Sequence, residues 1–322
     1  GRRFRDALVD QARTGKRVRL VYDGFGCLQT PDHFFESMRR AGVEVSNFNP
    51  VRRIGALRHW RTLDRRNHRK LLVIDENVAY LGGINISNEL AGWEDAHVRI
   101  EGSIVQDARK SFETVWNKRY RRLTRHRATR KLLGRSHTII LDGFPAPNLS
   151  PIKRAHLLLF GQARRRIRIA HAYLIPDRRL IRVLRRAVRR GVDVHVLVPA
   201  HSDVSSVDWA RRHVLGKLLR SGVQIRRHNE PLLHSKTAVS DESCAIVGSA
   251  NLNRASYFRN LEIALWSRDS RIVGPLAERF DLLWESATPY TLAQHQRRGW
   301  SRRFLSSIVY RLQFLLPVDQ AW

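Results

Sequence analysis

The sequence predicts an α/β protein made of two similar domains, each with helices on both faces of a sheet. Segments with the helical spacing of apolar residues alternate with short β-branched segments, which is typical of such α/β sandwiches. The same order of segments occurs twice along the chain. The 322 residues also suffice for about two domains of roughly 150 residues, each with a hydrophobic core of its own.

The second half shows the order of elements most clearly. Ser150 and Pro151 are a typical cap and first residue of a helix, which we expect to reach about Ala163. The next predicted elements are a strand at 167–174, a helix from 178 that ends at Gly191, and a strand at 192–198. A further helix and strand follow and end at 221–225.

The first half repeats this order, but from its second helix onward. A helical stripe in residues 4–12 ends at Gly15, and residues 18–22 form the strand that follows. Another helix and strand end at 41–45. Nothing corresponds to the helix and strand that open the second half, so we expect the first domain to be truncated at its N-terminus.

We expect the first domain at 1–135, including a basic linker over 118–135, and the second at 136–300, followed by an amphipathic tail at 301–322. A run of Arg and Lys usually belongs to a solvated helix end, and its functional alternative is contact with lipid head groups or nucleic-acid phosphates. Apolar side chains follow one side of the tail, with arginines beside them. Such a helix usually packs on its own domain, and the alternative is a position in a membrane interface.

One polar motif occurs once in each half, with its residues at matching offsets. The first copy consists of His68, Lys70, Asp75, Gly83 and Asn85. The second copy consists of His234, Lys236, Asp241, Ser249 and Asn251. A single His-x-Lys triplet arises by chance, but two copies that match through Gly and Asn indicate two half-sites of one active centre.

The residue types of the motif favour chemistry on a phosphate. A predicted strand follows each motif, so His and Lys, two residues apart, point to the same face. One imidazole can attack phosphorus while an ammonium group stabilises charge on the non-bridging oxygens. A second imidazole can protonate the departing alcohol and deprotonate the incoming one. We therefore predict catalytic roles for His68, Lys70, His234 and Lys236.

The aspartates and the small residues of the motif complete the predicted site. Asp75 and Asp241 are further catalytic candidates, although each lies five residues past its lysine and can instead brace the turn after the strand. Gly83 and Ser249 end a second strand and are predicted to let the backbone approach a phosphate closely. The predicted amide donors to the same phosphate are Asn85 and Asn251.

A histidine nucleophile needs an acceptor at its far ring nitrogen, because this acceptor fixes one tautomer. Asp95 lies 27 residues beyond His68, and Glu262 lies 28 residues beyond His234. These two acids are therefore the candidates for orienting the histidines that precede them. The chain has no zinc-type spacing of Cys and His and no Gly-rich Walker loop, so the sequence predicts a site without metal or cofactor.

The chain is strongly basic, with 59 Lys and Arg against 29 Asp and Glu and a net charge of +30. A field of this sign favours an anionic partner, either nucleic acid or an acidic membrane surface. No segment approaches the roughly 18 uncharged apolar residues of a spanning helix. Charge alone does not choose between the two partners.

The paired motifs resemble those of the phospholipase D superfamily, whose signature is a duplicated H-x-K-x4-D, over nearly the whole chain. The flanking segments are similar more specifically to bacterial cardiolipin synthases. These segments are 66–70, 82–86, 93–98, 101–102 and 112–116 in the first half, and 173–177, 233–236, 248–251 and 260–262 in the second. The resemblance implies two phospholipase D-like domains related by a pseudo-twofold axis. It also implies the type without N-terminal transmembrane helices, bound peripherally to the cytoplasmic face of the bacterial inner membrane.

By this resemblance, His68 carries a phosphatidyl group, His234 is the acid and base, and the aspartates of the motifs are largely structural. The implied reaction is cardiolipin synthesis, in which one phosphatidylglycerol loses glycerol to form a phosphohistidine and a second phosphatidylglycerol attacks it. The expected partner is an anionic phospholipid membrane; nucleic acid is not expected, and no obligatory protein partner is inferred. The alternative is a phospholipase D-type lipid hydrolase or nuclease with water as acceptor.

Overall fold

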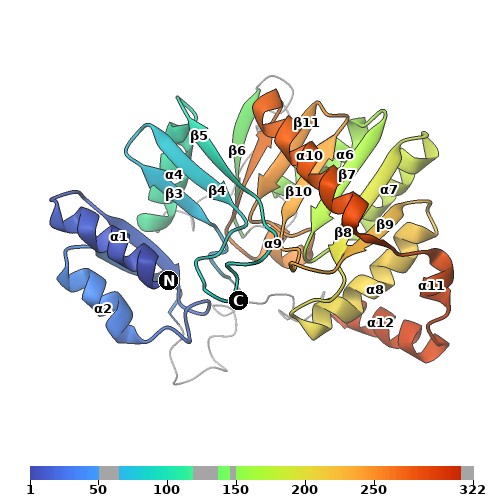
Figure 1. Cartoon of the computed structure of the whole chain (residues 1–322), viewed down its shortest axis with the longest axis horizontal. Coiled ribbons are helices and arrows are strands. Elements are labelled where there is room, and N and C mark those ends of the chain that lie inside the picture. Colours follow the sequence, from blue (N-terminus) through green and yellow to red (C-terminus); the bar gives the residue numbers. More distant parts are fainter. Residues whose placement is uncertain (51–64, 119–136, 146–149, 313–322) are drawn as a thin grey trace.

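The computed structural model describes residues 1–50, 65–118, 137–145 and 150–312. The first half forms two small sheets (Figure 1). Its elements are α1 (Arg2–Arg13), β1 (Arg19–Asp23), α2 (Asp32–Arg40), β2 (Glu44–Phe48), β3 (Leu71–Ile74), β4 (Val78–Gly82), β5 (His97–Glu101) and α4 (Val105–Trp116). Strands β1 and β2 are parallel, and β3, β4 and β5 form an antiparallel sheet.

The second half is built on one sheet of eight strands, in the order β13-β9-β8-β7-β10-β11-β12-β6. Its strands are β6 (Thr138–Gly143), β7 (Arg166–His171), β8 (Asp193–Pro199), β9 (Gln224–His228), β10 (Lys236–Ser240), β11 (Cys244–Gly248), β12 (Glu262–Ser267) and β13 (Thr288–Pro289). Its helices are α6 (Pro151–Gln162), α7 (Arg178–Arg189), α8 (Ser205–Leu219), α9 (Arg254–Phe258), α10 (Ser270–Ser286), α11 (Leu292–Gln296) and α12 (Trp300–Leu312).

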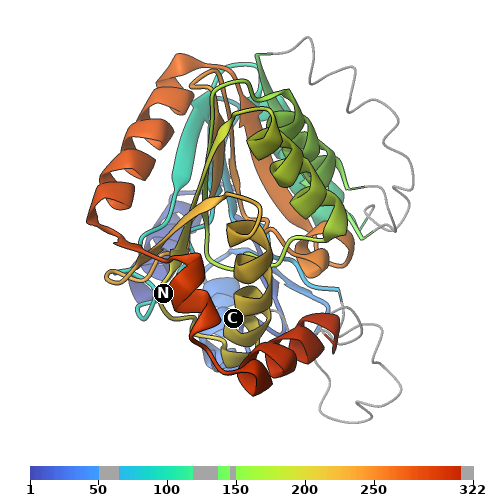
Figure 2. The same ribbon diagram turned by 90° about the vertical axis from the view of Figure 1, so that its right-hand side faces the viewer.

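The predicted α/β sandwich is confirmed, because helices cover both faces of the large sheet. Helix α10 lies on one face, and α6 and α7 lie on the other (Figure 2). Local sequence accounts for the helix ends. The Ser150 side chain accepts a hydrogen bond from the Lys153 amide at the start of α6, and Asp177 caps α7 in the same way. Gly191, just past α7, has a φ of 84°, which glycine adopts readily.

The two halves differ at the position of β7. In the second half β7 joins the parallel strands β8 and β9 to the antiparallel strands β10, β11 and β12. The described residues of the first half contain no counterpart of α6 and β7, as the sequence repeat predicts. Their parallel pair and their antiparallel strands therefore remain separate sheets.

The halves share a hydrophobic core, which fixes them against each other. Ala79 and Leu81 of β4 pack with Ile263 and Leu265 of β12, and all four side chains are buried. Strand β6, which follows the first half in the chain, pairs with β12 of the second half. The active-site residues therefore lie at a packed junction between the two halves.

Two predicted segments are only partly described. The basic linker at 118–135 lies almost wholly outside the described residues, and the tail is described only as far as Leu312, the end of α12. Strand β7 ends at His171, three residues earlier than predicted, and the chain then leaves the sheet. None of the helices in the described ranges has the length and apolar character needed to cross a bilayer.

Candidate active site

The two histidine motifs enter the site on short segments that pair with the opposite half. The His68 amide donates to the Leu261 carbonyl at 2.9 Å, and the His234 amide donates to the Glu94 carbonyl at 2.7 Å. Both contacts belong to parallel bridges between the halves. The backbone itself thus places each histidine beside the segment that carries the acid of the other half.

The acids are exchanged between the halves. Nδ1 of His68 lies 3.0 Å from Oε2 of Glu262, and Nδ1 of His234 lies 2.6 Å from Oδ2 of Asp95. The sequence spacing assigned each acid to the histidine of its own half, and this pairing is wrong. The physical reason is the pair of bridges between the halves, which align Leu261 with Asn67 and Glu94 with Leu233.

Burial and charge set the protonation of this centre. Burial lowers the pKa of His68, and the Glu262 carboxylate opposes this shift only in part. Burial, followed by the Lys236 ammonium, lowers the pKa of His234 to about 3. Both rings are therefore neutral at pH 7 in the free protein, with Nδ1–H facing the acid. Lys236 Nζ also lies 2.6 Å from Nδ1 and 3.0 Å from Nε2 of His234.

The carboxylates are charged although they are buried. Burial opposes the charge on Glu262, but His68 and Lys70 outweigh it and lower its pKa. Burial opposes the charge on Asp95 in the same way, and Lys236 and then His234 lower its pKa. Each half of the site is thus a buried group of one imidazole, one lysine amine and one carboxylate.

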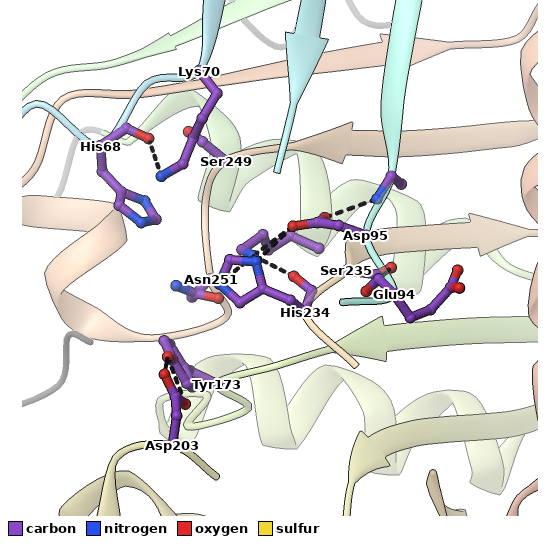
Figure 3. Close-up of polar contacts among 12 residues, drawn as sticks. His68, Lys70, Glu94, Asp95, Tyr173, Asp203, His234, Ser235, Ser249 and Asn251 are labelled. Carbon is purple, nitrogen blue, oxygen red and sulfur yellow. Dashed lines mark hydrogen bonds and ion pairs between the residues drawn. The ribbon is translucent and has the colours of Figure 1, made fainter. Parts of the chain in front are cut away.

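Both lysines rest against their own motifs. Lys70 Nζ donates to the His68 carbonyl at 2.9 Å, and Lys236 Nζ donates to the His234 carbonyl and lies 3.5 Å from Asp95 Oδ2. Burial lowers the pKa of Lys70 to about 7. Figure 3 shows His68, Lys70, Asn251 and His234 turned toward one region. An anion in that region would give each ammonium a stronger acceptor than a neutral carbonyl.

The small residues at the ends of β4 and β11 contact the acids. A Cβ on Gly83 would lie 2.1 Å from Asp95 Oδ1, so only glycine leaves room for this carboxylate. The Ser249 hydroxyl, which is fully buried, donates to Glu262. Gly83 and Ser249 thus contact the two carboxylates, and their approach to a phosphate stays a prediction.

The two asparagines differ in their surroundings. Asn251 is 1 % exposed, and its Oδ1 is buried without a partner among the described residues, whereas Asn85 is half-buried. The close-up places Asn251 beside His234 (Figure 3). Asn251 is therefore the better placed of the two predicted amide donors.

The motif aspartates lie outside the site. Asp241 accepts hydrogen bonds from the amides of Arg164, Arg165 and Arg166, at 2.7 to 2.9 Å, and so ties the turn after β10 to the start of β7. Asp75 is exposed in the corresponding turn after β3. Both have a φ of 51°. Their catalytic assignment is corrected to a structural one, which is the alternative that their distance from the lysines left open.

Two neighbours of His234, and the acid that one of them contacts, were not among the predicted site residues. The Trp93 and Tyr173 rings lie 5.3 and 6.2 Å from the His234 ring, both edge-on. The Tyr173 hydroxyl donates to Asp203 at 2.7 Å. Trp93 and Tyr173 lie in segments that resemble cardiolipin synthases, which was a usable signal, but nothing in the loop before α8 distinguishes Asp203.

The sequence is similar to a family model and to several curated proteins. The sequence model of the family described as "Cardiolipin synthase, PLD-like domain" matches residues 1–116 and 157–284. The major cardiolipin synthase ClsA of Bacillus subtilis (strain 168) is 33 % identical over 318 residues, which are 94 % of this chain and 65 % of that protein. The cardiolipin synthase of Oceanobacillus iheyensis is 31 % identical over 318 residues, 96 % of this chain and 66 % of that protein.

Solved structures show the shared fold. Phosphatidylserine synthase of Haemophilus influenzae Rd KW20 superposes with a TM-score of 0.63 at 13 % identity, over 99 % of this chain and 93 % of that chain. Polyphosphate kinase of Porphyromonas gingivalis gives 0.58 at 14 % identity, over 96 % of this chain and 46 % of that chain. The chain spans about two thirds of the length of the curated relatives it matches. With the family model matched in both halves, the chain belongs to the cardiolipin synthase family with the phospholipase D-like domain.

Proposed function

We propose that the protein is a cardiolipin synthase, which transfers a phosphatidyl group from one phosphatidylglycerol to another and releases glycerol. The observation that carries this proposal is the exchange of acids, since it supplies two neutral, oriented imidazoles to one centre. Transfer through a covalent intermediate needs two such groups, one for attack and one for proton transfer. The relatives' names supply the substrate class.

In the first step Nε2 of His68 attacks phosphorus. The bond from phosphorus to nitrogen forms, the bond from phosphorus to the glycerol oxygen breaks, and His234 gives its proton to that oxygen. Glu262 stabilises the cationic ring that His68 becomes during attack. His234 takes up its proton when the lipid binds, because an anionic phosphate raises the pKa of a neighbouring imidazole.

In the second step a hydroxyl group of another phosphatidylglycerol gives its proton to His234 and attacks the phosphorus of phosphohistidine. The bond to His68 breaks, and cardiolipin leaves. Lys70 and Lys236 turn from the carbonyls they contact to the non-bridging oxygens of the phosphate. In a buried site their positive charge strongly stabilises the negative charge that develops there. Asn251 donates its amide to the same oxygens, and we assign the corresponding contact in the first half to Asn85.

The substrate places the enzyme at the surface of an anionic membrane, and we propose a peripheral position on the cytoplasmic face of the bacterial inner membrane. The net charge of +30 supports binding to such a surface. Neither nucleic acid nor an obligatory protein partner is needed for the reaction. We also retain the division into domains at 1–135 and 136–300 with a tail at 301–322, and the pairing of β6 with β12 supports placing β6 in the second domain.

The test is to incubate the full-length protein with vesicles containing phosphatidylglycerol and to follow lipids and glycerol by mass spectrometry. We expect cardiolipin and glycerol in equal amounts from the wild type, and neither from His68→Ala. Phosphatidic acid without cardiolipin would replace the proposal with a lipid hydrolase. Cleavage of DNA that is lost in His68→Ala, with no change in the lipids, would replace it with a nuclease.

A further inference from the structure

A second basic site lies between α8 and α12, and the motif residues are not part of its wall. It is a cavity of about 330 Å³. Four arginines line it, together with two histidines and the aromatic rings at the start of α12. The arginines are Arg212, Arg220, Arg298 and Arg303. A neighbouring hollow shares Arg220 and adds Lys217, Arg185 and Arg189, which extends the positive surface along α8 and α7.

The charge of this cavity is not neutralised within the described part of the chain. Arg212 forms an ion pair with Asp208, which also pairs with Arg211, whereas the other three arginines of the wall have no carboxylate partner among the described residues. The Nη1 of Arg298 is buried and has no hydrogen-bond partner there. A buried donor without a partner is costly, so an acceptor that enters the cavity would be bound favourably.

The two histidines of the wall respond to the same field. Burial lowers the pKa of His295 to about 4, with Arg298 and Arg220 as the next causes. Burial also lowers the pKa of His213 to about 4, followed by Lys217 and Arg220. Both rings are neutral at pH 7, so the arginines carry the charge of the cavity.

Helix α12 presents its apolar side outward. The residues it buries are Ser306 and Tyr310. Trp300 and Phe304 are 76 % and 63 % exposed, and Leu305 and Leu312 are 46 % and 43 % exposed. The apolar side predicted from the sequence is therefore not the side that packs on α8. Figure 2 shows α12 lying along the outside of the molecule next to α8.

Charge and apolar surface together select one kind of occupant. The arginines suit a phosphate, and the exposed side of α12 suits the boundary between head groups and acyl chains. A nucleic acid would satisfy the arginines and could stack on the aromatic rings, but it offers nothing to Leu305 and Leu312. The combination therefore favours a phospholipid in a bilayer.

We propose that the cavity between α8 and α12 binds the phosphate of an anionic phospholipid molecule other than the one in the active centre, while the outer side of α12 inserts into the bilayer surface. This inference rests on the proposed function in that both require a membrane lipid. A link to the active centre exists. The Tyr310 hydroxyl donates to the Pro176 carbonyl at 3.3 Å, and Tyr173 of the same loop contacts the His234 ring. Helix α12 thus contacts the loop that carries Tyr173, next to the active centre.

The experiment measures binding rather than turnover, so it remains informative if no cardiolipin forms. The full-length protein is sedimented with vesicles of phosphatidylcholine that contain about 30 mol % phosphatidylglycerol. This content gives the vesicles an anionic surface. The variant Arg220→Glu/Arg303→Glu reverses two exposed charges of the site. Its matched control, Arg3→Glu/Arg13→Glu, makes the same change in net charge on exposed positions of α1. Thermal unfolding of each variant checks that it is folded.

We expect the site variant to bind about 10- to 30-fold more weakly than the wild type, and the control to bind within about 3-fold, because charges near the surface contribute most. Equal losses in both variants would reduce the effect to bulk charge and overturn the proposal. A second variant, Trp300→Ser/Phe304→Ser, keeps the charge and should also weaken vesicle binding. The proposal is wrong if only the arginine variant loses vesicle binding. It is also wrong if the arginine variant still binds vesicles but no longer binds single-stranded DNA, because the site then binds another anion.

Discussion

Glu262 lies in the second half of the chain, yet its carboxylate is 3.0 Å from Nδ1 of His68 in the first half. The reciprocal contact joins Asp95 to His234 at 2.6 Å. Neither half therefore holds a complete pair of histidine and acid.

Replacing Glu262 should slow the reaction at His68, which lies in the other half of the chain. In Glu262→Gln the amide can still accept from Nδ1–H, but it cannot stabilise the cationic ring, so we expect turnover of phosphatidylglycerol to fall about 10²- to 10⁴-fold. Glu278→Gln on the exposed side of α10 is the matched control and should keep wild-type turnover. Nitrogen NMR of His68 should show that Nδ1–H is retained, so that the lost rate reports the missing charge of Glu262. An unchanged rate in Glu262→Gln would contradict the assignment.

The covalent intermediate should be trapped when proton transfer is disabled. A p-nitrophenyl ester of phosphatidic acid has a leaving group that needs no acid, so His234→Ala should release one equivalent of p-nitrophenol and then stop. Mass spectrometry should find the phosphatidyl group on the peptide with His68. His68→Ala should give no burst, and a label on His234 in the wild type would reverse the roles of the two histidines.

The charge of Lys236 should control the protonation of His234. After burial, this ammonium is the largest cause that lowers the pKa of His234. Lys236→Met removes it, so the pKa of His234 should rise, and the pH at which the free protein protonates this ring should rise with it. A proton NMR titration measures the shift. The control is Lys110→Met, which changes a lysine that is 75 % exposed, and it should leave the His234 titration where it is.

The space beside Asp95 should admit only glycine at position 83. In Gly83→Ala the new Cβ would meet Oδ1 of Asp95 at 2.1 Å, so the carboxylate must leave His234. We expect a loss of activity of at least about 10²-fold, as for other displaced catalytic groups. Gly92→Ala is the matched change, because its Cβ would meet no atom within 4 Å. Its activity should stay near that of the wild type, and equal losses in both variants would argue against this role of Gly83.

The two motif aspartates should differ in their effect on stability. Asp241 accepts hydrogen bonds from three backbone amides. Asp241→Ala removes their acceptor, and this loss should lower the free energy of unfolding by about 1–3 kcal/mol. Asp75→Ala makes the same change at the same φ in an exposed turn and should cost less. Urea unfolding followed by circular dichroism compares the two. A larger loss in Asp75→Ala would contradict the structural role given to Asp241.

Much of the fold could be predicted because it depends on local periodicity. The two strands expected after the first motif are β3 and β4, and the first helix ends before Gly15 as expected. The repeat also predicted that the described residues of the first half would hold no counterpart of β7. Each of these features depends on the residues of a single segment, so a sequence repeat is enough to predict it.

The partners of the acids could not be predicted in the same way. A repeat gives the distance from His68 to Asp95 along the chain, but their separation in space depends on how the halves dock. The bridge between Asn67 and Leu261 decides that His68 meets Glu262. The outward side of α12 is another such case, because the pattern shows an apolar side and only packing shows which side is covered.

The exchange of acids also has a consequence for the order in which the protein is made. Domains generally form from the N-terminus during synthesis. A nascent chain that has completed the first half contains His68 and Lys70, but the carboxylate that prepares His68 for attack lies almost two hundred residues further along. Glu262 must therefore be synthesised, and the second half must fold, before His68 gains its acid. Both histidines gain their acids only when the second half has folded. We therefore expect a chain that ends before Glu262 to have no activity, rather than half of it.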